Sequence, residues 1–145
     1  MLNFCPLCVA EVYALRCDAM RAGTSHYPLH RVEREDTALE VGSGSLLVYA
    51  TPCMAALMEA AACEAIAAGL AETETTVGIE LNLRHIAATP VGMEVHAKAE
   101  VTEVEGKIIT FSIEAFDEAG TIGTAVHKRA LVNSQKFLDK TYDKL

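Results

Sequence analysis

The chain has 145 residues, which is the length of one ordinary domain with a hydrophobic core of its own. Hydrophobic residues make up 51% of it and charged residues 22%, as in soluble globular proteins. Its formal net charge of -8 argues against binding to nucleic acid, whose phosphates attract basic surfaces.

Residues 1–25 show no clear periodicity. We expect them to be an appendage to a domain at residues 26–138, with a short tail at residues 139–145. The first segment lacks the basic start of a signal peptide, and Glu11 interrupts its apolar stretch. No secretory leader is therefore expected, and Met20 is an alternative start of translation.

The five cysteines are Cys5, Cys8, Cys17, Cys53 and Cys63. An odd number of cysteines without a secretory leader favours free thiols and a cytoplasmic protein. Cys5 and Cys8 form a CxxC pair, but a zinc site needs two further ligands at suitable spacing. Only Cys17, His26 and His30 lie nearby, so we expect neither a metal nor a cofactor.

A first strand is predicted at Leu29–Glu35, followed by a loop at Asp36–Ser45 that serves as a lid or as a plain connection. Gly42 and Gly44 in this loop do not form a phosphate-binding loop, since the Gly-Lys-Ser/Thr ending is absent.

Thr51 and Pro52 open a predicted helix that runs to Ala68 and ends at Gly69. Threonine is favoured as an N-cap, proline at the first helical position, and glycine just after a helix. Nearly every side of this helix is apolar, so we expect protein to surround it.

The stretch Pro52–Leu70 has nearly the length of a membrane span. Glu59 and Glu64 lie inside it, and a charge in the middle of a membrane is costly. We therefore expect a buried helix of a soluble protein, without membrane association.

The remainder of the chain alternates between apolar and polar residues with a period of two, which indicates strands with one apolar face. The predicted inner faces consist of Val77, Ile79, Leu81 and Leu83, then Met93, Val95, Ala97, Ala99 and Val101, and then Ile109, Phe111, Ile113 and Ala115. Turns are predicted at Glu105-Gly106 and Glu118-Ala119-Gly120, a last strand at Thr121–Asn133, and a frayed polar tail at Lys136–Leu145. One buried helix followed by a meander of antiparallel strands predicts an α+β fold in which a sheet wraps around the helix.

Two side chains are candidates for chemistry. His85 continues the apolar series of its strand and should point toward the helix, as a functional group or as a core histidine with one hydrogen bond. Glu59 lies within the apolar helix, where a carboxylate is costly unless it is paired, functional or at an edge that reaches water. A carboxylate that faces a histidine is a common general-base or nucleophile site.

Thr51 has a structural explanation as the N-cap, but its distance from Glu59 is informative. Eight positions place the two residues about 12 Å apart along the helix. A single reaction centre would therefore need a substrate that spans this gap, or residues from two chains of a symmetric dimer.

Three blocks of the sequence occur in order and at suitable separations: Val48–Glu59, Thr76–Gly92 and Gly123–Arg129. Together they resemble the fluoroacetyl-CoA thioesterase-like branch of the hotdog-fold thioesterases. The resemblance implies a hotdog fold, with a long central helix wrapped by an antiparallel sheet. It also implies a homodimer or a higher oligomer that hydrolyses an acyl-CoA to a free acid and CoA, with active sites between the subunits.

By this resemblance the catalytic residues are Thr51, Glu59 and His85. Glu59 attacks the thioester carbonyl or activates water, His85 orients or protonates the reacting groups, and Thr51 hydrogen-bonds in the same network. Gly78 is implied to lie near the acyl group. Arg129 is implied to position other groups or to help hold the CoA.

The fluoroacetyl-specific member of this branch carries aromatic lid residues ahead of its catalytic threonine. The matching stretch Ala38–Leu46 contains no aromatic residue, so we expect a short or medium acyl group rather than selectivity for fluorine. Two alternatives stay open. A hotdog enoyl-CoA hydratase would need an Asp and a His near the helix start, which Thr51–Leu57 lacks. A non-catalytic acyl-CoA-binding module would not require Glu59 and His85.

Overall fold

The computed structural model describes residues 24–26 and 29–145 of the chain. Residues 1–23 of the predicted appendage, with Cys5, Cys8 and Met20, therefore lie outside the described residues, whereas its last two residues, Thr24 and Ser25, belong to a strand that pairs with the sheet. The strands are β1 (Thr24–His26), β2 (His30–Arg31), β3 (Glu74–His85), β4 (Glu94–Glu105), β5 (Ile108–Asp117) and β6 (Gly120–Asn133). The helices are α2 (Ala38–Val41), α3 (Thr51–Ile66) and α4 (Ser134–Tyr142), with 3-10 turns η1 (Arg34–Asp36) and η2 (Ala67–Gly69).

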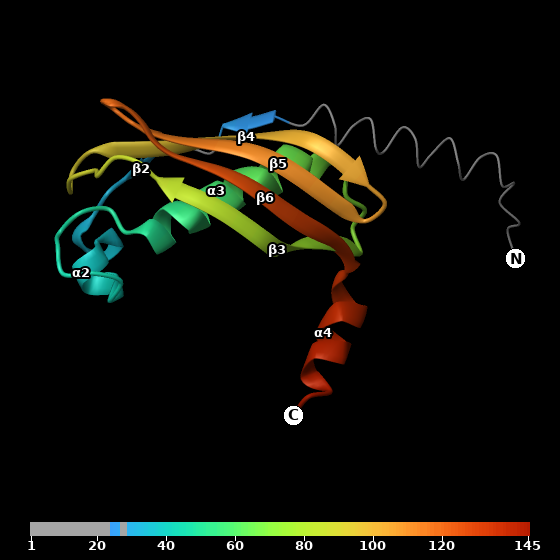
Figure 1. The fold of residues 1–145 in the computed structure, drawn as a ribbon. Coiled ribbons are helices and arrows are strands. Elements are labelled where there is room, and N and C mark those ends of the chain that lie inside the picture. The colour runs from blue at the N-terminus through green and yellow to red at the C-terminus, as the bar shows by residue number, and fades with distance from the viewer. Residues whose placement is uncertain (1–23, 27–28) are drawn as a thin grey trace, which may run out of the picture.

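The strands form one antiparallel sheet in the order β1-β4-β5-β6-β3, and β2 also pairs with β4. The sheet curls around α3, which lies along its concave side (Figure 1). This arrangement confirms the predicted helix wrapped by an antiparallel sheet.

The alternation predicted for β4 and β5 is confirmed by the core. The inward residues of these strands include Val95, Ala97 and Ala99 on β4 and Phe111 and Ile113 on β5, each at most 1% exposed. They pack with Met54, Met58, Ala61 and Ile66 of α3 in one cluster. The central strands therefore hold the helix by apolar contact, as the sequence pattern indicates.

The single alternation predicted for β3 is wrong in its first half. The register against β6 shifts between Gly78 and Glu80, so a bulge moves the following side chains to the opposite face. Before the bulge Thr76 faces inward and is buried, whereas Ile79 is 54% exposed. After the bulge Leu81 and Leu83 pack against the core, as predicted.

The start of α3 also differs from the prediction. The N-cap is Ala50, whose φ of −75° and ψ of 139° are extended, and no side chain caps the helix. Met54 donates its backbone N–H to the Ala50 carbonyl, so Thr51 already belongs to the first turn, with Pro52 next to it. The Thr51 hydroxyl is therefore free for another partner.

Within one chain, protein covers only one side of α3, and not every side as predicted. Its buried residues, such as Met58 and Ala62, line one side, whereas Ala56 and Cys63 are exposed. Thr51–Gly69 is long and apolar enough to cross a membrane, but its buried side belongs to the core of the sheet. The exposed apolar side leaves room for contact with a further surface.

The predictions for the first strand and for the C-terminal tail are corrected. The strand predicted at Leu29–Glu35 shortens to β2, because a capping box between Glu33 and Asp36 turns the chain into η1. The tail predicted to fray forms α4, because the Asn133 side chain accepts a hydrogen bond from the Lys136 backbone and caps the helix. Figure 1 shows α4 extending away from the sheet.

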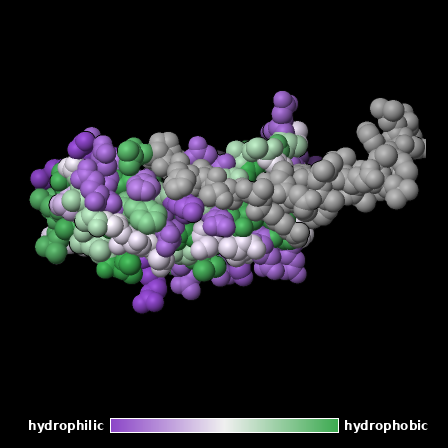
Figure 2. All heavy atoms as spheres, turned by 90° about the horizontal axis from the view of Figure 1, so that it is seen from above, coloured by the Kyte–Doolittle hydropathy of each residue, from purple (hydrophilic) through white to green (hydrophobic). Residues whose placement is uncertain are grey.

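Exposed apolar side chains gather at the end of the molecule that holds α2 (Figure 2). Leu39 is 43% exposed, Leu46 is 66% exposed, and Ile86, in the segment after β3, is 56% exposed. This end of the molecule therefore offers apolar surface close to the start of α3.

Gly123 on β6 is required by the packing of α3. A Cβ atom there would lie 2.5 Å from Met54 Cε and 3.1 Å from the Arg84 carbonyl oxygen. We expect Gly123→Ala to lower the free energy of unfolding by about 1–3 kcal/mol, the usual cost of overpacking, as measured by urea denaturation. In a Met54→Ala background the same change should cost less. An equal cost in both backgrounds would contradict this explanation.

Candidate active site

Thr51 and His85 are in contact where the start of α3 meets the end of β3. Thr51 lies in the first turn of α3 and His85 is the last residue of β3, and Thr51 Oγ1 is 2.8 Å from His85 Nδ1. Both line a hollow of about 310 Å³ together with Ile86, Ala87 and Ala88. The opposite ring nitrogen, His85 Nε2, is buried and has no hydrogen-bond partner in the described part of the chain. It therefore retains the capacity for one more polar contact.

Glu59 points from the middle of α3 toward β6. Its Oε2 accepts a hydrogen bond from Arg129 at 2.9 Å and lies 3.8 Å from His127 Nε2. The Glu59 side chain is 41% exposed, so one side of the carboxylate is open to solvent. The histidine that faces this carboxylate within the chain is therefore His127, and not the predicted His85.

Arg129 is buried and held on several sides. It donates through Nε to Thr76 Oγ1 and through Nη2 to the Thr76 carbonyl, each at 2.9 Å. Its Nη1 lies between Glu59 Oε2 and His127 Nε2, which is 3.1 Å away. A buried guanidinium with this many acceptors is fixed in one orientation, and its Nη1 donates to the Glu59 carboxylate.

Gly78 is the part of β3 that makes room for the carboxylate. A Cβ atom at this position would lie 2.7 Å from Glu59 Oε2, 3.2 Å from His127 Cε1 and 3.4 Å from Arg129 Nη1. Any larger residue must push the carboxylate out of place. The glycine is thus explained by close approach of a charged group to the backbone.

Sequence reasoning overlooked His127 and Thr76. A signal was present, because His127 and Arg129 are two residues apart on one strand and so share a face. Two basic residues on the inward face of a strand need a polar partner, and Glu59 is one of the two acidic residues of the apolar helix opposite. Thr76 could not be placed, because the bulge that turns it inward has no clear mark in the sequence.

The predicted residues thus form two separate groups in one chain. One group is Thr51 with His85, and the other is Glu59 with Arg129 and Gly78. Eight helical positions separate the groups by about 12 Å along α3. No group of three or more His, Cys, Asp or Glu side chains suited to a metal ion occurs among the described residues.

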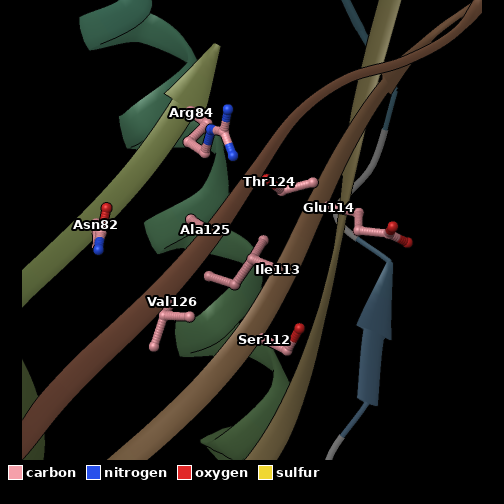
Figure 3. A pocket seen from close by; sticks show the side chains of 8 residues that line it. All are labelled: Asn82, Arg84, Ser112, Ile113, Glu114, Thr124, Ala125 and Val126. Carbon is pink, nitrogen blue, oxygen red and sulfur yellow. The ribbon is translucent and has the colours of Figure 1, made fainter. Parts of the chain in front are cut away.

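A further hollow of about 270 Å³ lies over β3, β5 and β6 (Figure 3). It is lined by Asn82, Arg84, Ser112, Ile113, Glu114, Thr124, Ala125 and Val126. None of the predicted site residues borders it, so it is distinct from the two groups described above.

One helix held in the curve of an antiparallel sheet is the hotdog architecture, and the comparisons with known proteins place the chain among the thioester hydrolases of this fold. Residues 32–135 match the family described as fluoroacetyl-CoA-specific thioesterase. The chain belongs to this family.

Individual relatives agree with this assignment. The fluoroacetyl-CoA thioesterase of Streptantibioticus cattleyicolor is 37% identical over 97 residues, which are 67% of this chain and 70% of the relative. A solved structure of a fluoroacetyl-CoA thioesterase superposes with a TM-score of 0.79 at 30% identity, covering 86% of this chain and 97% of that chain. A Thermus thermophilus member of the thioesterase superfamily superposes with a TM-score of 0.76 at 26% identity, covering 87% and 98% of the two chains.

Proposed function

We propose that this protein hydrolyses a short or medium acyl-CoA to the free acid and CoA, at a site that two chains build together in the cytoplasm. The family supports acyl-CoA hydrolysis, and one solved relative, at 31% identity, is a complex with fluoroacetate and CoA. The observation that carries the proposal is the division of polar groups within one chain. Each chain holds a Thr51–His85 pair and a distant Glu59–Arg129 pair.

The edge strand β3 offers the means of joining two chains. It is 12 residues long, lies at the end of the sheet, and pairs within the described chain with β6 alone. Long open edges tend to pair with another strand. An antiparallel pairing of two β3 strands about an axis between Leu81 and Asn82 would set His85 opposite Gly78 of the second chain. Because Gly78 touches Glu59 of its own chain, this pairing completes the site twice per dimer.

The chemistry follows from the charges of the two groups. Glu59 is the nucleophile or the base: its carboxylate attacks the thioester carbonyl, or removes a proton from a water molecule that does so. The carbon–sulfur bond then breaks, and the CoA thiolate takes up a proton. Direct attack leaves a mixed anhydride of the acyl group with Glu59, which a water molecule hydrolyses to the free acid and the restored carboxylate, whereas attack by water gives the free acid at once. His85 orients or protonates the reacting groups through Nε2, which has no hydrogen-bond partner in the described part of the chain, while Thr51 holds the opposite ring nitrogen.

The end of the molecule that holds α2 favours an aliphatic acyl group. The stretch from Ala38 to Leu46 has no aromatic side chain, and its Leu39 and Leu46 are exposed, as is the nearby Ile86. Ile86, Ala87 and Ala88 line the hollow that holds the Thr51–His85 pair, and this aliphatic lining suits a hydrocarbon chain and has no feature that singles out fluorine. A short or medium acyl group is therefore the proposed substrate.

The test is thiol release from a series of acyl-CoA thioesters, from acetyl to long-chain, beside a binding measurement on the same series. Turnover that peaks at a short or medium chain supports the proposal. A protein that binds these thioesters with saturation and releases no thiol is a binding module, and the enzymatic proposal then fails. A preference for fluoroacetyl-CoA over every alkyl thioester would overturn the substrate class alone.

Gly78 provides a separate prediction. We expect Gly78→Ala to lower kcat by roughly 10- to 100-fold, since a displaced carboxylate loses the alignment on which catalysis depends. The displacement is expected because the added Cβ atom would lie only 2.7 Å from Glu59 Oε2. Steady-state kinetics and thermal unfolding should be compared, because a loss of kcat without a matching loss of folded protein is the expected pattern. A kcat within twofold of wild type would show that the carboxylate can move without consequence.

A further inference from the structure

We infer that His127 is a positioning residue of the proposed site: its Nε2 accepts a hydrogen bond from Arg129 and thereby fixes the guanidinium that holds Glu59. This inference rests on the proposed function, since it concerns the carboxylate proposed to act on the thioester. It gives a role to His127, a buried histidine that is not among the residues of the proposed reaction.

The two ring nitrogens of His127 have different partners, and these partners determine the tautomer. Nδ1 lies 2.8 Å from the Glu80 carbonyl oxygen, which can only accept, so Nδ1 carries the proton. Nε2 lies 3.1 Å from Arg129 Nη1, which can only donate, so Nε2 has a free lone pair that accepts. One neutral tautomer satisfies both contacts.

The same contacts exclude His127 as the general base. Its single available lone pair already accepts a hydrogen bond from Arg129, and the ring is 1% exposed. A base must reach a water molecule or a substrate with a free lone pair. His127 therefore acts through Arg129, which contacts Glu59 at 2.9 Å.

The bulge of β3 accounts for this arrangement. The register shift between Gly78 and Glu80 lies beside the Glu80 carbonyl that His127 contacts. The same segment contains Gly78, which gives the carboxylate its space. One irregularity of the strand thus serves both the histidine and the glutamate.

The surroundings of His127 favour its neutral form. Burial lowers its pKa below the ordinary value, and Arg129 lowers it further, whereas the contact with Glu80 and the charge of Glu59 oppose the shift. The charged groups that face the ring are Arg129 on its own strand and Glu59 on α3, and the Phe111 ring lies 6.0 Å away on β5. A second proton would place an N–H against the guanidinium and break the contact, so the arrangement should loosen as the pH falls.

Two amide variants separate the two hydrogen bonds. Gln places its amide oxygen near the position of Nε2 and can still accept from Arg129, whereas Asn reproduces only the donor at Nδ1. We expect His127→Asn to lower kcat roughly 10- to 100-fold with little change in KM, the effect of losing a hydrogen bond to a charged group. His127→Gln should lose much less, and its activity should persist to lower pH than that of wild type.

A measurement without substrate keeps the inference distinct from the proposed function. Nitrogen NMR of the folded wild type, with His127→Gln used to assign the signal, should show the Nδ1–H tautomer and a ring that stays neutral below pH 6.5, the ordinary pKa. The opposite tautomer, or equal kcat values for the Asn and Gln variants, would overturn the positioning role. Absence of turnover in wild type with the expected tautomer would refute the proposed function and leave the hydrogen-bond arrangement standing.

Discussion

Replacing Glu59 with Gln is expected to reduce thioester turnover by about a thousandfold or more, since it removes the proposed nucleophile or base while keeping the shape of the side chain. The amide oxygen can still accept the Arg129 hydrogen bond, so the guanidinium keeps a partner. Thiol release under saturating acyl-CoA is the measurement. KM should change far less than kcat, because the carboxylate acts mainly on the reacting carbonyl.

The matched control is Glu118→Gln, the same change in charge on an exposed residue of the turn between β5 and β6. This variant should keep wild-type turnover. Thermal unfolding of both variants guards against a trivial loss of folded protein. Glu59→Gln with substantial turnover and a normal melting curve would remove Glu59 from the chemistry and shift attention to the Thr51–His85 pair.

The second large effect is recovery of activity when two inactive variants are mixed. His85→Asn and Glu59→Gln should each be nearly inactive alone. If the site joins His85 of one chain to Glu59 of the other, a mixed dimer has one intact site and one site with both defects. With random exchange half of the dimers are mixed, so the mixture should approach about a quarter of wild-type activity.

The design of this experiment distinguishes a shared site from a site within one chain. Co-expression with two different tags allows the mixed dimer to be isolated and its activity to be measured directly. A mixture of Glu59→Gln with Glu59→Gln carrying the second tag is the control and should stay inactive. No recovery in the isolated mixed dimer would show that Glu59 and His85 act within one chain, and the pairing of two β3 strands would lose its functional argument.

Much of the architecture follows from the sequence, because the period of the apolar residues is set by the geometry of each element. The alternation on β4 and β5 identifies the inward residues, such as Val95 and Phe111, and both are buried. The apolar run after Thr51 identifies the central helix. The presence of Glu59 in that run marks it as a residue that needs a partner, and it has one in Arg129.

The tertiary structure alone decided that His127, and not His85, faces Glu59 within the chain. A strand has two faces, and one inserted residue exchanges them, so the bulge at Gly78 and Glu80 could not be located from alternation. It turns Thr76 inward toward Arg129 and leaves Ile79 exposed.

The roles of the residues around the helix ends were also decided by long-range contacts. Thr51 has the type of an N-cap, but its hydroxyl contacts His85, which is 34 residues away in the chain. Local sequence determined which residues are helical, extended or apolar, since these properties depend on near neighbours. The pairing of Glu59 with His127 and Arg129 depended on strand register, which only the packed sheet defines.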